Sequence, residues 1–313
     1  MGIAPLISLP TVSSSACVPA LLQVRGLNVT YGDADADSVP ALRDVNFDVT
    51  PGEIVGILGE SGCGKSTLAL SILGLLPGNA SIEGCVLFKG ENLREADELR
   101  RRAIRGAKIS MIFQDPGLSL SPVMRVGDQI TEVMRAHGIT TQKLRRQKCE
   151  EILKEVQFSD VHRIYTAYPH QLSGGELHRI AIAQALCCRP DLVIADEATR
   201  SLDTKIQAEV LRVLRAVNQQ SGSALIFITH NPALLAGFAD RVMVMYAGRI
   251  VEDGSVSQVF RQPSHPYTKA LLQLVPKSLQ HISLTAQGRF PTIPSSLTGS
   301  DHQVRDCGLH HGN

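Results

Sequence analysis

Short strand-like runs of apolar residues alternate with longer helix-like segments along most of the chain. Residues 21–31 and 43–50 alternate apolar and polar positions, which predicts half-exposed strands. Continuous apolar runs predict buried strands at 53–58, 109–113, 192–195 and 224–229. Residues 241–246 and 249–252 flank an Ala-Gly pair and predict a hairpin. Strands that alternate with helices predict an α/β fold.

Between residues 115 and 188 the helical period dominates, as in 126–137 and 143–156, which predicts a helical insertion. The first charged side chain is Arg25, so the chain opens with a neutral stretch. Prolines interrupt that stretch and it has no basic segment, so neither a spanning helix nor a secretory signal is expected. We expect a disordered leader over residues 1–20 and a flexible tail over 291–313.

Composition and charge limit the partners and the location that the protein is expected to have. The 31 basic and 30 acidic side chains leave a net charge of +1, so nothing calls for a nucleic-acid partner. The basic run 94–108 is interleaved with acidic residues and is interpreted as a solvated helix face. Seven irregularly spaced cysteines indicate free thiols in a reducing compartment. No other segment is apolar enough to span a bilayer, so a membrane role would require a partner.

The strongest chemical signal is the stretch 59–67, which matches the phosphate-loop pattern G-x-x-x-x-G-K-[ST] without a mismatch. It stands between a predicted strand and a predicted helix, 65–76, as that motif requires. Its lysine would reach the outer phosphates of a nucleotide, and the Ser66 hydroxyl would bind Mg²⁺. We expect the nucleotide to be bound by Gly59, Glu60, Ser61, Gly62, Cys63, Gly64, Lys65, Ser66 and Thr67.

A second signal is the apolar strand that ends in Asp196 and Glu197. In phosphoryl transfer, the first acid after such a strand holds Mg²⁺, directly or through water. The second acid can polarise a water molecule for attack on the γ-phosphate. We therefore expect Asp196 to be a metal ligand and Glu197 to be the general base.

Leu-Ser-Gly-Gly-Glu at 172–176 precedes a strongly periodic helix, where glycines and a helix N-terminus suit a phosphate. With the phosphate loop and the two acids, this segment resembles the signature of the ATP-binding subunits of ABC transporters. The order and spacing agree over roughly residues 21–290. The resemblance implies a P-loop NTPase (RecA-like) core with an antiparallel β subdomain and a helical insertion subdomain. It also implies that the ATP-binding domain spans residues 21–260.

The resemblance assigns further residues to ATP. Gln114 is similar to the glutamine that contacts Mg²⁺ or the attacking water, and His230 to the histidine that touches the γ-phosphate. Tyr31 either stacks on adenine or packs on its own sheet. Two such subunits meet head to tail, so that the ATP of one also contacts Ser173, Gly174 and Gly175 of the other. The resemblance thus implies a second ATP-binding subunit, identical or not.

The chain departs from the family pattern at several positions, of which two concern the closed dimer. Glu176 stands where glutamine is commoner, and it either forms a capping box with Ser173 or weakens ATP closure. Arg200 follows Asp196 and Glu197 at a position that is usually small. It either forms an ion pair across the dimer or makes the subunit prefer a non-identical partner.

Residues 112–116, 122–129 and 265–272 resemble the oligopeptide, dipeptide and nickel importers within that family. We expect an oligopeptide-transporter-type region at 261–290. Many members of that group continue into a cysteine-rich tail, but Cys307 alone cannot hold an iron–sulfur cluster. His302, His310 and His311 stand near Cys307 and could bind a metal ion with it. A loose tail remains the simpler interpretation.

The sequence therefore predicts an ATPase, with ATP and Mg²⁺, that energises import through separate membrane permease subunits. The cargo would be a peptide or, alternatively, a nickel or metal chelate or another small solute, delivered by an extracytoplasmic binding protein. The subunit would lie at the cytoplasmic face of a bacterial inner membrane. Soluble ABC ATPases of DNA repair or translation are the rivals, but no coiled coil, zinc module or second ATPase unit is apparent. A GTPase is disfavoured because no guanine-reading segment is apparent.

Overall fold

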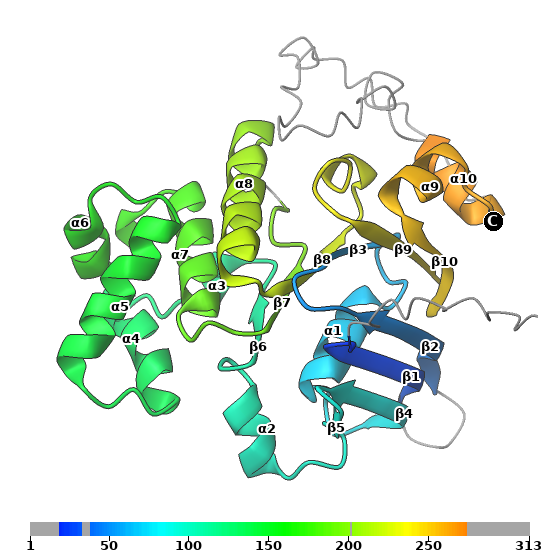
Figure 1. Ribbon diagram of the computed structural model, residues 1–313, viewed down its shortest axis with the longest axis horizontal. Coiled ribbons are helices and arrows are strands. Elements are labelled where there is room, and N and C mark those ends of the chain that lie inside the picture. The colour runs from blue at the N-terminus through cyan, green and yellow to red at the C-terminus, as the bar shows by residue number, and fades with distance from the viewer. Residues whose placement is uncertain (1–18, 33–37, 201, 274–313) are drawn as a thin grey trace, which may run out of the picture.

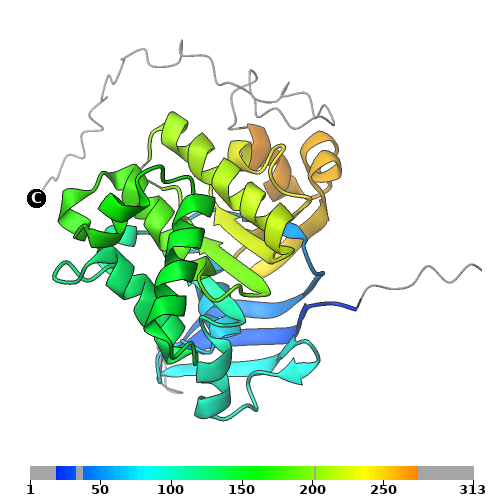
Figure 2. The ribbon, with the colours of Figure 1, turned by 60° about the vertical axis from the view of Figure 1, so that its left-hand side comes forward.

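The computed structural model describes residues 19–32, 38–200 and 202–273. Two β-sheets lie at the centre, and a lobe of helices projects from one side of them (Figure 1). Figure 2 shows the molecule turned by 60°, so that this lobe comes forward. The expected leader lies almost entirely outside the described residues, and so does the expected tail with Cys307 and its neighbouring histidines.

The smaller sheet is antiparallel, with strand order β2-β1-β4-β5. Its strands are β1 (Leu22–Tyr31), β2 (Val39–Val49), β4 (Ala80–Phe88) and β5 (Glu91–Asn92). The larger sheet has the order β10-β9-β3-β8-β7-β6, and only β10 runs antiparallel to its neighbour. Its strands are β3 (Ile54–Leu58), β6 (Ile109–Ile112), β7 (Leu192–Asp196), β8 (Ala224–Thr229), β9 (Arg241–Tyr246) and β10 (Arg249–Ser255).

Helices cover both faces of the larger sheet. Near the strands lie α1 (Lys65–Leu73), α8 (Thr204–Ser221), α9 (Val256–Arg261) and α10 (Pro266–Gln273), whereas α2 (Glu98–Ile104) projects from the connection between β5 and β6 (Figure 1). The helical lobe is the part of the chain between β6 and β7. It contains α3 (Pro116–Ser119), α4 (Val126–Ala136), α5 (Gln142–Glu155), α6 (Val161–Thr166) and α7 (Gly174–Leu186). Two 3₁₀ turns, η1 (Pro169–Gln171) and η2 (Pro232–Leu234), complete the described elements.

The larger sheet divides the hydrophobic core in two. In β3, Val55 and Ile57 face the cluster shared with α1 and the smaller sheet, whereas Ile54 and Leu58 face the cluster shared with the other helices. Alternate residues of a strand point to opposite faces, so a strand covered on both sides must be apolar throughout. The continuous burial of β3, β7 and β8 confirms the strands predicted from their apolar runs.

Some elements differ from the sequence prediction. Helix α1 ends at Leu73 and not at residue 76, because Gly74 adopts a left-handed conformation that caps it. Strands β4 and β5 were not predicted. The middle of the basic run 94–108 forms α2, where Glu98 pairs with Arg101, Arg102 and the C-cap residue Arg105, and this confirms the solvated helix face.

An ion-pair network joins the two sheets. The Arg241 guanidinium of β9 donates to Glu53 Oε1 at 2.7 Å and to Asp253 Oδ2 at 2.8 Å, and it also contacts the backbone oxygen of Asp48 in β2. Burial alone would raise the pKa of Glu53, but hydrogen bonds from Arg241 and Thr50 hold that pKa below its usual 4.5.

Because the Glu53 pKa is lower in the folded than in the unfolded chain, its ion pair stabilises the fold above about pH 4.5. That contribution is lost as the pH falls through the lowered value. We expect Glu53→Gln to reduce the free energy of unfolding at pH 7 by roughly 1–3 kcal/mol. Melting temperatures measured between pH 7 and 3 should fall less steeply for Glu53→Gln than for the wild type, and parallel curves would contradict this. The exposed control Glu150→Gln should change stability by under about 0.5 kcal/mol.

Candidate functional site

The sequence-predicted residues gather at one edge of the larger sheet. Strands β3, β8 and β7 are parallel neighbours, so their carboxyl ends meet there. Leu58 of β3 leads into the phosphate loop, Asp196 is the last residue of β7, and His230 follows β8. Ligand sites in open α/β sheets form outside such strand ends.

Glycines allow the loop to follow its course. Gly62 and Gly64 have φ values of 82° and 108°, in the left-handed region that glycine accommodates best. A Cβ atom on Gly59 would lie 2.4 Å from the backbone oxygen of Met245. Backbone bonds tie the loop to the β9–β10 turn, since Gly248 N donates to Cys63 O at 3.0 Å. Burial raises the pKa of the Cys63 thiol, although Lys65 opposes this, so that cysteine is a packing residue of the loop.

The Lys65 ammonium is buried inside the loop. Only 5% of the residue is exposed, and Nζ donates to the backbone oxygens of Gly59 at 2.8 Å and Glu60 at 2.7 Å. A buried ammonium needs such partners because water no longer solvates it. The backbone of the loop therefore orients the charge that would neutralise phosphate oxygens.

Asp196 and Ser66 fit a Mg²⁺ site. Asp196 is 7% exposed, and its Oδ1 atom is buried without a hydrogen-bond partner among the described residues. Burial raises the pKa of this carboxyl, the nearby Ser66 hydroxyl lowers it, and the Glu197 charge raises it further. A hydroxyl and a buried carboxylate beside a phosphate loop are the protein ligands that Mg²⁺ uses in such sites.

Two side chains contact the Glu197 carboxylate. The Arg200 guanidinium donates to its Oε2 atom at 3.0 Å, and His230 Nδ1 lies 3.4 Å from its Oε1 atom. Glu197 is 9% exposed and has a φ of 46°, which a non-glycine residue rarely adopts. The structure therefore brings together Glu197 and His230, as the sequence predicts. It pairs Arg200 with Glu197 in the same chain, which neither hypothesis about Arg200 included.

Tyr31 lies half-buried at the end of β1 and packs against the apolar cluster that contains α1. Its hydroxyl donates to Thr67 Oγ1 at 3.3 Å. One part of the ring is therefore packed against the cluster and another part is accessible, and the hydroxyl links Tyr31 to the phosphate loop.

The signature residues 172–176 lie apart from the phosphate loop and the two acids, because α7 belongs to the helical lobe and lies away from α1 (Figure 1). Ser173 and Glu176 form the capping box that the sequence suggests: Ser173 N donates to Glu176 Oε2 at 2.9 Å, and Glu176 N donates to Ser173 Oγ at 3.3 Å. Glu176 also pairs with Arg163. A Cβ atom on Gly174 would meet nothing within 4 Å, so no packing in the described chain requires glycine there.

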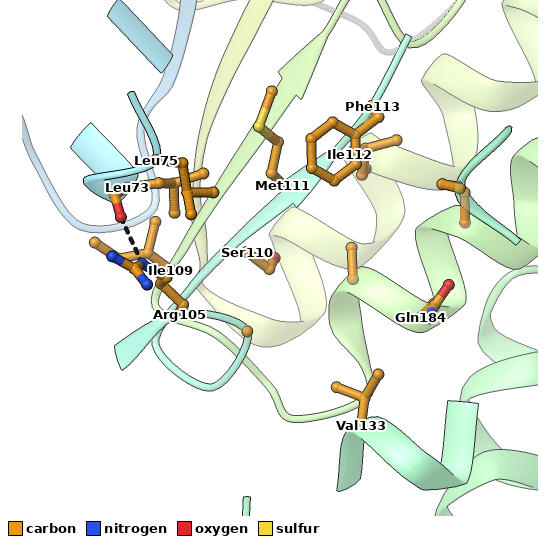
Figure 3. Close-up of a pocket in the computed structure, with 14 residues that line it drawn as sticks. Leu73, Leu75, Arg105, Ile109, Ser110, Met111, Ile112, Phe113, Val133 and Gln184 are labelled. Carbon is orange, nitrogen blue, oxygen red and sulfur yellow. Dashed lines mark hydrogen bonds between the residues drawn. The ribbon is translucent and has the colours of Figure 1, made fainter. Parts of the chain in front are cut away.

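Gln114 is exposed two residues after the end of β6, at the border between the larger sheet and the helical lobe. A groove of about 250 Å³ opens beside it, and Figure 3 shows Phe113, Met111 and Leu75 along one side with Val133 and Gln184 across from them. The Arg105 guanidinium donates to Leu73 O at 2.7 Å and closes one end of the groove. Among the residues that the structure describes, no hydrogen bond or ion pair joins Gln114 to Asp196 or Glu197.

Comparisons with known proteins agree with this geometry. The model of the ABC transporter family matches residues 42–200. A probable peptide ABC transporter ATP-binding protein of Sinorhizobium fredii is 47% identical over 289 residues, covering 92% of this chain and 85% of that protein. The dipeptide transport ATP-binding protein DppD of Escherichia coli K12 is 41% identical over 293 residues, covering 93% and 88%.

Among solved structures, the dimeric ATP-binding cassette MJ0796 bound to ADP and Pi has a TM-score of 0.66 at 27% identity, covering 75% of this chain and 98% of that one. The cbiO1 protein of Clostridium perfringens has a TM-score of 0.67 at 26% identity, covering 83% and 97%. The chain therefore belongs to the ABC transporter family, and it carries the ATPase domain of that family. The family and the P-loop fold predicted from the motifs are confirmed.

The sequence did not point to two contacts of the site. Arg200 was singled out as unusual, but its partner was sought in another subunit. Tyr267 entered the sequence analysis only as part of the importer-like segment 265–272, yet its hydroxyl accepts a hydrogen bond from Glu60 N at 3.2 Å. The signal that could have pointed to this contact is the aromatic residue within the His-Pro-Tyr-Thr segment.

Removing the buried Asp196 charge should stabilise the protein measured without nucleotide. We expect Asp196→Asn to raise its free energy of unfolding by about 1 kcal/mol, as is common when a functional site is relieved of strain. The same variant should lose the increase in melting temperature that Mg-ATP gives the wild type. A variant that is less stable and still responds to Mg-ATP would contradict this account of Asp196.

Releasing Glu197 from Arg200 should change turnover and not affinity. We expect Arg200→Ser to raise the basal ATPase rate two- to tenfold, because a partly exposed ion pair of roughly 1 kcal/mol no longer holds the carboxylate. The ATP dissociation constant should stay the same. A steady-state assay that shows an unchanged or lower rate would assign Arg200 a different role.

Proposed function

We propose that this chain is the ATP-hydrolysing subunit of an ABC importer that takes up peptides through separate membrane subunits. The observation that supports this proposal most strongly is that Lys65, Asp196 and Glu197 lie together at one edge of the larger sheet. There they would bind phosphate, the metal ion and the attacking water next to one another. The names of the relatives support peptides as cargo, because they are peptide and dipeptide transport proteins. A nickel chelate or another small solute is the alternative.

In this proposal the chain's own groups divide the work. The loop amides, Lys65 and Ser66 bind the phosphates of ATP, and Tyr31 contacts the adenine. Bound Mg²⁺, held by Ser66, Asp196 and Gln114, would neutralise charge on the β- and γ-phosphates. Glu197 accepts a proton from the attacking water, and His230 orients that water beside the γ-phosphate.

The second half of the site comes from another ATP-binding subunit. Gly174 stands at the start of α7 with open space above it, and the helix N-terminus provides N–H donors for a phosphate. We propose that Ser173, Gly174 and Gly175 contact the ATP bound by the partner. ATP then favours the closed dimer because it contacts both chains only there. The likeness to a dimeric ATP-binding cassette supports this.

We propose that the groove beside Gln114 receives a helix of the membrane subunit. Leu75 and Phe113 expose 43% and 46% of their surfaces along it, which suits an apolar helix face. The groove lies between elements of the larger sheet and of the helical lobe, so a relative movement of the two would reach its occupant (Figure 3). Among the described residues, no helix has both the length and the apolar character to cross a bilayer.

The remaining parts of the proposal concern organisation and place in the cell. The ATP-binding domain comprises residues 21–260 with a helical subdomain at about 115–188, followed by an oligopeptide-transporter-type region at 261–290. The subunit works at the cytoplasmic face of a bacterial inner membrane, and an extracytoplasmic binding protein delivers the cargo.

Glu197→Gln tests the proposed chemistry. We expect this variant to bind ATP with wild-type affinity but to hydrolyse it about a thousandfold more slowly, because the amide cannot accept the proton. Equilibrium nucleotide binding and single-turnover hydrolysis measure the two effects separately. The control Glu132→Gln, in the helical lobe, should keep both parameters. Full turnover in Glu197→Gln would assign the base to another group.

A further inference from the structure

One peptide unit of the phosphate loop is held at both of its polar atoms. The oxygen of the Gly59–Glu60 peptide accepts from Lys65 Nζ at 2.8 Å. The N–H of the same peptide, which belongs to Glu60, donates to the Tyr267 hydroxyl at 3.2 Å. The first contact comes from within the loop, and the second comes from a helix 207 positions further along the chain.

Rigid elements position the Tyr267 hydroxyl. Its ring packs against Tyr246 of β9, with the ring centroids 4.3 Å apart. The carboxylate of Glu252, on β10, accepts from Ser264 N at 2.8 Å and from His265 N at 3.1 Å just before α10 begins. Burial alone would raise the pKa of Glu252, but donors of the 264–268 segment hold it below its usual range, so this carboxylate is charged at neutral pH. Leu271 then packs α10 into the core.

The contact matters because Lys65 has two possible sets of partners. Its ammonium bonds to loop oxygens in the structure, and in the proposed function it turns to the phosphates of ATP. The Gly59 oxygen then loses its charged partner, whereas the N–H of that peptide keeps the Tyr267 hydroxyl. Glu60 is exposed, so without Tyr267 only water would hold this peptide in place.

We propose that Tyr267 is a positioning residue for ATP. Through its hydroxyl on α10, it keeps the start of the phosphate loop in the conformation that binds ATP. The inference rests on the proposed ATPase function and deepens it. Tyr267 acts through Glu60 and does not touch the nucleotide itself. By linkage, ATP binding also stabilises the attachment of α10 to the loop.

Tyr267→Phe in the full chain tests this, because it removes the hydroxyl and keeps the ring against Tyr246. Losing one hydrogen bond should weaken ATP binding and raise KM for ATP about two- to tenfold, with kcat unchanged. The melting temperature without nucleotide should stay close to that of the wild type. The control Tyr246→Phe removes the hydroxyl of the other ring and should leave KM unchanged.

A second variant and a second measurement keep the test decisive. If Tyr267→Phe behaves as the wild type while Tyr267→Ala is impaired, the ring only packs and the proposal is overturned. Hydrogen–deuterium exchange of residues 262–273 should slow when ATP binds the wild type, and it should slow less in Tyr267→Phe. Equal slowing in both proteins would also overturn it. If the wild type itself fails to bind or hydrolyse ATP, the proposed function fails and not the assignment of Tyr267.

Discussion

The buried ammonium of Lys65 is the constraint around which the site is organised. It is held by two backbone oxygens, and those oxygens are held in turn by the course of the loop. The loop keeps that course because the β9–β10 turn and the backbone of β2 lie against it: Arg43 N donates to Gly248 O at 2.9 Å, and Gly248 N donates to Cys63 O. A positive charge is thus placed close to the buried carboxyl of Asp196.

The arrangement separates two half-sites within one chain. Phosphate loop and acids lie at the edge of the larger sheet, whereas the signature lies at the start of α7 (Figure 1). A rigid chain cannot close one half on the other, since α7 packs against β6 and α8. In the proposed function, a second subunit that faces the first head to tail completes the two halves. Tyr267 adds a third element, through which α10 contacts the phosphate loop.

Much of this could be predicted from the sequence where the signal is local. Strands β3, β7 and β8 are continuous apolar runs because both faces are covered, and the loop residues follow one another along the chain. Strand β4 was missed because Gly84 interrupts it at a register shift, where a Cβ atom would lie 2.3 Å from Gly26 O. The contacts of Arg200 and Tyr267 could not be predicted, since they depend on which tertiary neighbours the fold provides.

The most direct test of the account is the mass of the complex that ATP forms. Sedimentation of Glu197→Gln with saturating Mg-ATP, alone and mixed with the second ATPase chain of the same transporter, measures it. The account predicts a dimer that forms with ATP, dissociates with ADP, and is lost when Ser173 is replaced by Arg. A protein that stays monomeric under all these conditions would contradict a nucleotide shared between two subunits.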